Sequence, residues 1–218
     1  RLPGIPDGVV DGVDGVRAKA REIIRAGADF LKIATTGGMG TARGTYEQRQ
    51  FTLAEVRAVV EEGRAFELPT AAHAYGGRGL KNALQAGVHS IEHLGPVDDE
   101  DLAFMAENGV FLVPTLCVAR YAIEHASPDP DGEESLRLRN ARRFVEMQRE
   151  RLQRAKALGV KICLGTDIGA FVHGENAREL QYLVDAGLTP IEALQAATST
   201  AAACLGMSDL VGTLRPGK

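Results

Sequence analysis

Four residues with metal-binding or acid–base side chains occur where short apolar segments of the sequence end. They are Lys32 in Phe-Leu-Lys-Ile, His73 in Ala-His-Ala-Tyr-Gly, His93 in Ile-Glu-His-Leu-Gly and Asp167 in Gly-Thr-Asp. Imidazole and carboxylate groups bind divalent metal ions and transfer protons. These four residues therefore indicate either a metal-binding site or a site for acid–base catalysis.

The two histidines form the most informative pair. A single histidine is more often a hydrogen-bonded core residue than a ligand. His73 and His93, however, each close a predicted strand, and they stand one strand–helix unit apart. Neighbouring parallel strands would place both rings at the same edge of a sheet, which favours a shared metal-binding role.

Asp167 and Lys32 each allow two interpretations. Asp167 is either a turn or N-cap aspartate or a carboxylate that binds metal and takes a proton from metal-bound water. Lys32 alternates with Leu31 and Ile33, so it faces away from them. It either reaches solvent at the strand end, or its amine reacts with carbon dioxide to give an anionic carbamate that can bridge two metal ions.

The elements that must position these residues repeat along the chain. An amphipathic helix ends at a glycine, typical of a left-handed helix terminus, and a short apolar strand follows. The terminating glycines are Gly27, Gly87, Gly109 and Gly159. The pattern predicts strands over 28–33, 69–73, 88–93, 110–114 and 160–165. It predicts helices over 16–26, from 53, over 78–86, after Asp98, over 134–158 and 176–186, and from 189.

Strands alternating with helices predict an α/β fold with a parallel sheet. An open doubly wound sheet and a TIM-type (β/α)8 barrel compete. The barrel is favoured because chemistry-bearing residues follow several strands, whereas an open sheet gathers its site at one switch point. The glycine-rich segment 37–44 lacks the GxGxxG spacing and the helix start of a dinucleotide loop, so we expect it to be a flexible loop over the barrel mouth.

These motifs, in this order, resemble the amidohydrolase superfamily. Lys32, His73, His93 and Asp167 look like its metal motifs on barrel strands 4, 5, 6 and 8. Segments 188–198 and 212–218 resemble its branch of Xaa-Pro dipeptidases and imidazolonepropionase-like proteins. The resemblance covers nearly the whole chain.

The resemblance implies a role for each of these residues. Lys32 would carry the carbamate that bridges two divalent metal ions, zinc by expectation. His73 and His93 would hold the second ion, and Asp167 would be both a ligand and the catalytic general acid–base. The implied reaction is hydrolysis of an amide or peptide bond in a small substrate, a dipeptide or an N-acyl amino acid, by a metal-bridging hydroxide.

Two further residues are candidate substrate contacts on the same resemblance. Tyr75 lies two positions after His73, and His173 lies in the loop after Asp167. Packing for Tyr75 and simple exposure for His173 are the competing interpretations. Specificity is expected in loops 35–50 and 119–135, the second of which contains a polar insertion after His125.

The sequence also departs from the family pattern. No His-x-His pair of the kind expected on barrel strand 1 is present, and the other histidines are His89, His125 and His173. We therefore expect residues 1–218 to form one partial barrel with strands 4–8, without strands 1–3 and the flanking β-sandwich. Expressed alone, this chain is expected to be inactive.

Two alternative functions remain open. One is a one-metal imidazolonepropionase- or deaminase-like hydrolase of a cyclic C–N bond, in which a bridging carbamate has no use. The other is an inactive barrel that binds a partner. The number of bound metal ions separates them: two for the leading hypothesis, one for the first alternative and none for the second.

Composition narrows the class of protein. The 218 residues are 44% hydrophobic and 25% charged, a globular balance, and the formal net charge is −4. This charge argues against nucleic-acid or anionic-membrane partners, and leaves a small-molecule substrate, with a homo-oligomer left open. Cys117, Cys163 and Cys204 form no CxxC pair, so neither a disulfide framework nor a zinc ribbon is expected. The reducing compartment that this favours makes the cytoplasm the expected location.

Overall fold

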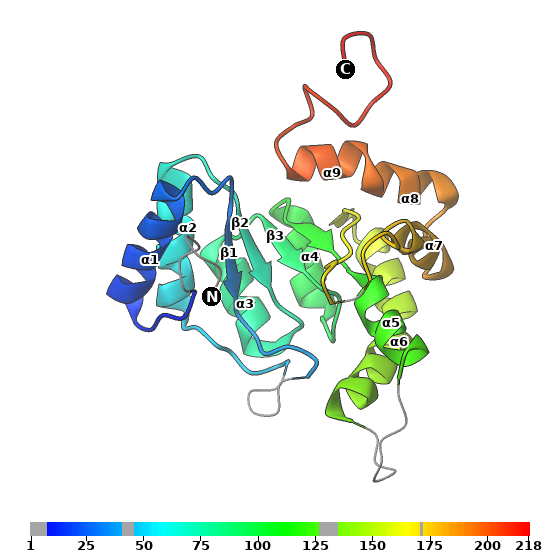
Figure 1. Ribbon diagram of the computed structural model, residues 1–218, viewed down its shortest axis with the longest axis horizontal. Coiled ribbons are helices and arrows are strands. Elements are labelled where there is room, and N and C mark those ends of the chain that lie inside the picture. The colour runs from blue at the N-terminus through cyan, green and yellow to red at the C-terminus, as the bar shows by residue number, and fades with distance from the viewer. Residues whose placement is uncertain (1–7, 41–45, 127–134, 171) are drawn as a thin grey trace.

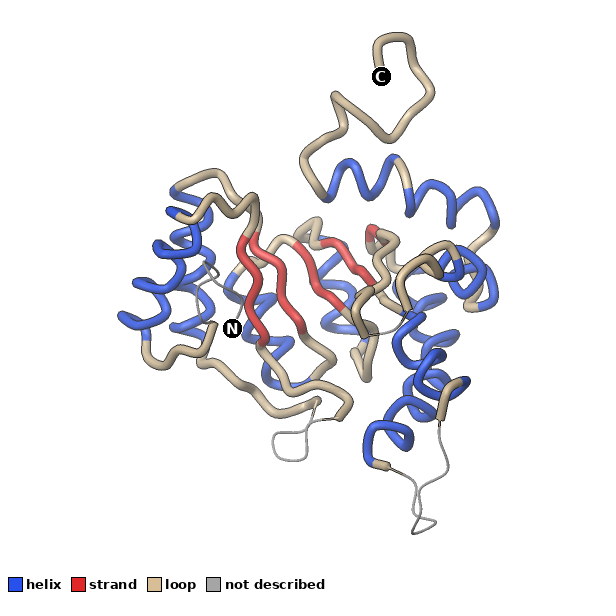
Figure 2. The backbone as a smooth tube through the Cα atoms, in the orientation of Figure 1, coloured by secondary structure: helices blue, strands red, loops and turns tan. Residues whose placement is uncertain are grey.

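The computed structural model describes residues 8–40, 46–126, 135–170 and 172–218. Five parallel strands, β1 to β5, lie side by side in chain order, and each is separated from the next by at least one helix (Figures 1 and 2). The strands are β1 Leu31–Ala34, β2 Thr70–His73, β3 Ser90–Glu92, β4 Phe111–Val113 and β5 Lys161–Ile162. This is a partial (β/α) barrel, as the sequence predicts.

The described part of the chain contains helices α1 to α9. They are α1 Val13–Arg25, α2 Leu53–Ala65, α3 Gly77–Ala86, α4 Asp99–Glu107, α5 Leu116–Glu124, α6 Leu136–Ala157, α7 Arg178–Asp185, α8 Pro190–Ala197 and α9 Ser199–Cys204. Local sequence explains several helix starts. Thr52 and Thr189 form capping boxes with Glu55 and Glu192, and the Asp98 side chain accepts from the Asp101 amide.

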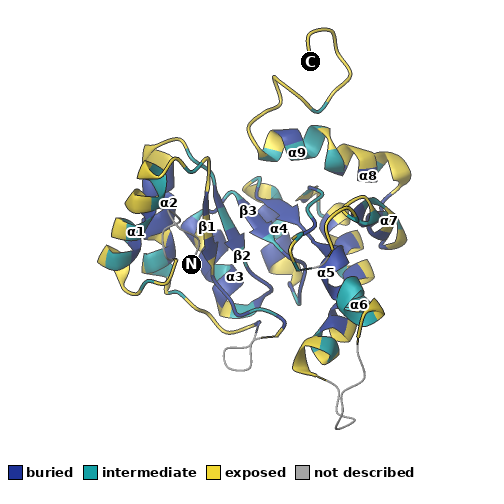
Figure 3. Cartoon of the chain, in the orientation of Figure 1, coloured by how far each residue is buried: buried dark blue, intermediate teal, exposed yellow. Residues whose placement is uncertain are grey.

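The strands bury one face against the helices that connect them, and on the opposite face Cys204 of α9 packs against the cluster that contains Phe111 and Val113 of β4. Leu31 and Ile33 are buried in the main core, whereas Lys32 and Ala34 on the opposite face of β1 are exposed. The core between sheet and helices is aliphatic, and it includes the fully buried Ile91 and Leu112. Figure 3 shows that the strands are largely buried. The face opposite the connecting helices therefore carries the candidate chemistry.

The register of the strands orders this inner face into rows. Ala34, His73, Glu92 and Val113 are successive partners across β1 to β4. Lys32, Ala71, Ser90 and Phe111 form the next row toward the start of the strands. Because parallel strands end at one edge, the first row lies at the rim, where barrel active sites occur.

Three sequence-based expectations need correction. Segment 119–135 was expected to be a loop, but its first part belongs to α5, because Leu116 to Ala119 are buried. Its polar insertion at 127–131 lies outside the described residues. The last strand is shorter than predicted, and α9 was not predicted as a separate helix.

The loop after β1 lies over the rim. Thr36 and Arg49 form an isolated antiparallel bridge, and Met39 and Tyr46 are buried. Asn140 of α6 donates to the Met39 carbonyl at 2.8 Å, so the described parts of this loop are packed against α6. Residues 41–44 of the glycine-rich segment lie outside the described residues.

None of the helices in the described ranges combines the length and the apolar character needed to cross a bilayer.

Candidate active site

Three neighbouring strands place polar side chains at the same rim of the partial barrel, where the strands end. His73 is the last residue of β2, His93 follows β3, and Thr115 follows β4. The His93 amide donates to the Val113 carbonyl at 2.8 Å, which extends the β3–β4 pairing up to the histidine. The sheet register therefore places these residues together without help from the loops.

The two predicted ligand histidines are in direct contact. His93 Nε2 lies 2.7 Å from His73 Nδ1, and the ring centroids are 4.4 Å apart. Tyr75 stacks on His93 at 4.7 Å with an interplanar angle of 9°, and meets His73 edge-on at 5.1 Å. The tyrosine ring therefore holds both imidazoles in place.

A chain of hydrogen bonds assigns the protons on these rings. His73 Nε2 lies 3.4 Å from the Gly37 carbonyl, which only accepts, so Nε2 carries the proton and Nδ1 is free to accept. His93 Nε2 then donates to His73 Nδ1. His93 Nδ1 is left to accept from the Thr115 hydroxyl, whose Oγ1 lies 2.7 Å away.

Burial keeps both imidazoles neutral. It lowers the pKa of His93 well below its usual value, and the neighbouring His73 and Lys32 act in the same direction. The pKa of His73 is also lowered, first by burial and then by the charge of Lys32, against the opposing effects of the Gly37 carbonyl and Asp167. A neutral imidazole is the form that binds a metal ion.

The backbone that follows Thr115 is hydrogen-bonded to a carboxylate that lies far away in the sequence. The fully buried Glu179 of α7 accepts from the Leu116 amide at 2.8 Å and the Cys117 amide at 2.7 Å. These are the first amides of α5, for which Thr115, the N-cap residue, supplies no side-chain cap. Glu179 therefore fixes the backbone that carries the hydroxyl facing His93.

Backbone strain gathers at the same rim. In the described part of the chain, four non-glycine residues have positive φ, and three of them follow β3, β4 and β5. They are His93 at 82°, Thr115 at 50° and Asp167 at 53°. This conformation is costly, above all for a β-branched residue such as Thr115, and strain of this kind tends to gather at functional sites.

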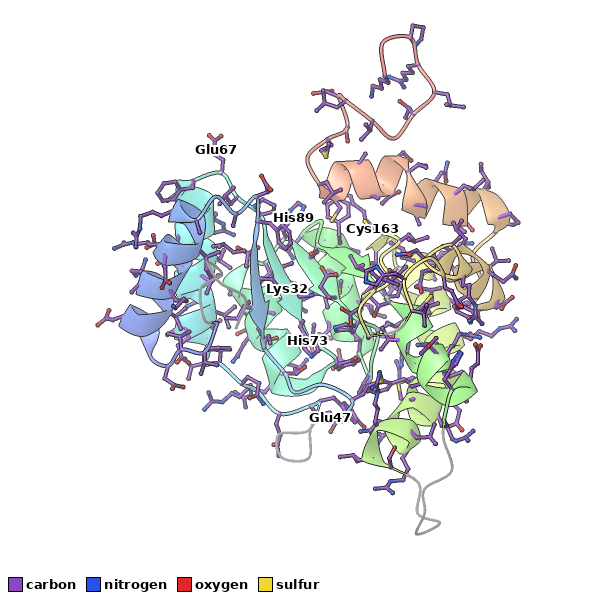
Figure 4. All side chains as sticks on the ribbon, viewed as in Figure 1. Lys32, Glu47, Glu67, His73, His89 and Cys163 are labelled. Carbon is purple, nitrogen blue, oxygen red and sulfur yellow. The ribbon has the colours of Figure 1, made fainter. Side chains whose placement is uncertain are left out.

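Lys32 and Asp167 lie near this pair but outside its direct contacts. Lys32 is exposed on β1, one row nearer the start of the strands than His73 (Figure 4), and Asp167 follows Thr166 in the loop after β5. Both charges affect the pKa of His73, in opposite directions. The structure therefore places both predicted residues within electrostatic reach of the histidines.

The two predicted substrate contacts have different surroundings. Tyr75 is buried, and burial raises the pKa of its hydroxyl, so the phenol is protonated. Its ring is sandwiched between His93 and Phe144 of α6, with centroids 4.7 and 4.8 Å away. His173 is exposed in the loop before α7. For both residues, substrate contact stays a prediction.

Sequence reasoning missed Glu92 and Thr115. Glu92 pairs in register with His73 on the inner face and accepts from Ser90 Oγ at 2.6 Å. Burial raises the pKa of its carboxyl group. The alternation of Ser90 and Glu92 along β3 pointed to an inward carboxylate. The position of Thr115 two residues after the end of β4 was the corresponding signal for the hydroxyl.

The donor types fit a divalent metal ion, but the described residues bring together only part of a site. No three His, Cys, Asp or Glu side chains in the described ranges are grouped closely enough to hold an ion. His73 Nδ1 and His93 Nε2 lie 2.7 Å apart, and in this hydrogen bond His93 Nε2 carries the proton, so a metal ion would replace that proton between the two rings. A stable site would need further donors beside this pair.

The comparisons with known proteins agree with one another on the family of this chain. The family model described as "Amidohydrolase family" matches residues 4–218. Ochratoxinase from Aspergillus niger is 33% identical over 211 residues, which are 96% of this chain and 43% of that protein. Imidazolonepropionase from Geobacillus thermodenitrificans is 32% identical over 183 residues, covering 79% of this chain and 37% of that protein. The chain thus spans less than half the length of these relatives.

Solved structures agree with the sequence matches. A crystal structure of a Xaa-Pro dipeptidase with bound methionine in its active site superposes with a TM-score of 0.86 at 33% identity. The match covers 100% of this chain and 55% of that protein. The partial barrel described above is therefore shared with whole barrels of this type.

Proposed function

The chain belongs to the amidohydrolase family, and from this premise we propose that it contributes part of the active site of a metal-dependent hydrolase. The substrate class is a small molecule with an amide or peptide bond, such as a dipeptide or an N-acyl amino acid. The names of two similar proteins, ochratoxinase and Xaa-Pro dipeptidase, support hydrolysis of this bond type.

One observation carries the proposal. His73 and His93 close neighbouring strands, are both kept neutral by burial, and direct ring nitrogens at one another across 2.7 Å. Two imidazoles with converging nitrogens at a barrel rim are suited to a shared metal ion. A structural role in the core would not need the strained backbone at His93.

His73, His93, Asp167 and a carbamate on Lys32 are the groups that would hold two divalent ions, with zinc as the candidate metal. When bound, such ions lower the pKa of a water molecule and polarise the scissile carbonyl. The Asp167 carboxylate would accept a proton from the attacking water and donate it to the leaving amine. The Thr115 hydroxyl can accept as well as donate, so it can hold His93 in either tautomer.

A one-metal hydrolase of a cyclic C–N bond is the second candidate. It is favoured by the relation to imidazolonepropionase and by the position of Lys32, which is exposed and outside the contacts of the histidine pair. In that case Lys32 would stay an unmodified amine. The substrate panel used in the assay therefore has to include cyclic amides and amidines.

The test is hydrolysis by the full-length protein before and after removal of metal with a chelator. We expect turnover of dipeptides or N-acyl amino acids that the chelator abolishes and added zinc restores. His73→Ala should remove this activity. His89→Ala is the matched control, because this histidine precedes β3, at the opposite end of the strand from His93, and it should leave activity unchanged. Turnover that survives metal removal would contradict the proposal.

A further inference from the structure

Two cysteines far apart in sequence meet on the inner face of the sheet. Cys163 directly follows β5, and its amide donates to the Leu112 carbonyl at 2.8 Å. With Phe111 and Val113 it forms a small buried cluster separate from the main core, and Cys204 at the end of α9 packs against this cluster. The Cys163 thiol also lies 3.5 Å from the Thr200 carbonyl of α9. This contact joins α9 to the end of β5.

A histidine completes the cluster. His89 stands just before β3, and its Nε2 donates to the Cys204 carbonyl at 2.8 Å. Its ring lies 5.1 Å from that of Phe111. Figure 4 labels His89 and Cys163 beside α9. Neither residue has a part in the hydrolytic site proposed above.

The surroundings favour a thiolate on Cys204. Hydrogen bonds from the Cys163 thiol and from His89 lower the pKa of Cys204, and the same contact with Cys204, together with burial, raises the pKa of Cys163. Lys161 and Glu92 are the other charged groups that act on the cluster. A thiolate beside a histidine is the reactive form of cysteine.

We propose that Cys204 and Cys163 are a modifiable thiol pair, which hydrogen peroxide converts into a disulfide linking α9 to the end of β5. The Cys204 thiolate attacks one peroxide oxygen, so an S–O bond forms, the O–O bond breaks, and the hydroxide released takes a proton from the His89 imidazolium, which becomes neutral, to give water. Cys163 then attacks the Cys204 sulfur. The S–S bond forms as the S–O bond breaks, and the departing oxygen leaves with the Cys163 proton as a second water.

Hydrogen peroxide is the oxidant in this reaction. The two sulfurs together lose two electrons, and peroxide gains them. Reduction by an added dithiol reverses the step through thiol–disulfide exchange. The disulfide would form four residues before Asp167, on the segment that leads into the proposed site.

The chain contains its own control thiol. Cys117 is buried at the start of α5, and burial together with the Glu179 carboxylate raises its pKa. It should therefore stay a neutral and unreactive thiol under conditions in which Cys204 reacts.

The first test is alkylation of the full-length protein with iodoacetamide at neutral pH, followed by peptide mass spectrometry. Cys204 should be modified roughly tenfold or more faster than Cys117, because the thiolate is the nucleophile. His89→Gln should slow the reaction at Cys204, and His125→Gln should not. Equal rates at the two cysteines would overturn the proposal.

The second test is mild peroxide treatment followed by digestion without reducing agent. A cross-linked peptide containing Cys163 and Cys204, lighter by two hydrogens, is expected in the wild type and in Cys117→Ser. It should be absent in Cys204→Ser and in Cys163→Ser. Sulfinic acid on Cys204 without any cross-link would refute the pairing, and this wild-type result stands even if a variant fails to fold. Neither test requires bound metal or hydrolytic activity.

Discussion

Replacing Thr115 by valine isolates the hydroxyl that faces His93. Valine keeps the β-branched shape, so it meets the same strain at φ 50° and fills nearly the same space. The substitution removes only the partner of His93 Nδ1, which lies 2.7 Å from Thr115 Oγ1. Both residues are buried, at 6% and 3% exposure, so water does not readily replace the lost contact.

The expected cost follows from this burial. A buried polar atom left without a partner costs about 1–3 kcal/mol. For a domain of about 150–250 residues, each kcal/mol of lost stability lowers the melting temperature by roughly 2–4 °C. We therefore expect Thr115→Val to destabilise the full-length protein by about 1–3 kcal/mol in urea denaturation. Thr115→Ser retains the hydroxyl and should lose less.

A second readout separates positioning from simple stability. Groups that orient a metal-binding histidine typically change metal affinity by about 10–100-fold when removed. Zinc affinity should fall by that order in Thr115→Val and far less in Thr115→Ser, and nitrogen NMR of His93 should show an altered tautomer. Thr115→Val with wild-type stability and metal affinity would refute the hydrogen-bonded arrangement described above.

Three other residues give sharp expectations. Glu179→Gln should cost roughly 1–3 kcal/mol in urea denaturation, because the side-chain amide replaces one of the two oxygens that accept from the α5 backbone amides. Glu175→Gln, at a partly exposed ion pair, should change stability by less than about 0.5 kcal/mol. The hydrogen bond from Lys156 lowers the pKa of Glu192 to about 2, so its stabilising effect is present above its unfolded value near 4.5 and is lost as pH falls toward 2. Urea midpoints measured across that window should depend less on pH in Glu192→Gln, and an unchanged slope would contradict the assignment. The Asp167→Asn variant should keep its bound metal but lose about 10²–10⁴-fold in turnover, because asparagine cannot accept the proton. A variant with near-native turnover and lost metal would show that Asp167 is a metal ligand and not the general base.

The sequence was most informative where local chemistry decides the structure. Glycines with left-handed geometry end the predicted helices, as at Gly87 with φ 83° and Gly159 with φ 84°. Capping boxes at Thr52 and Thr189 begin α2 and α8 close to the predicted helix starts at 53 and 189. Alternation in β1 placed Lys32 on the face opposite Leu31 and Ile33. Such features depend on neighbours along the chain and can be read directly from it.

The sequence was least informative where the partners are distant. α5 starts without a cap of its own, because its first amides are satisfied by Glu179 more than sixty residues later. The positive φ of His93 turns its ring toward His73, and a non-glycine residue gives no warning of that conformation. Cys163 and Cys204 meet only because α9 packs against the sheet. These contacts depend on the tertiary fold.

The metal content of the full-length protein and of its Lys32→Ala variant tests the central claim most directly. Metal analysis of the purified proteins by mass spectrometry gives the number of ions per chain. The proposed site predicts two divalent ions in the wild type and at most one in Lys32→Ala, because the variant lacks the bridging carbamate. A wild type that binds no divalent ion, or a Lys32→Ala variant that keeps two ions and normal turnover, would contradict it.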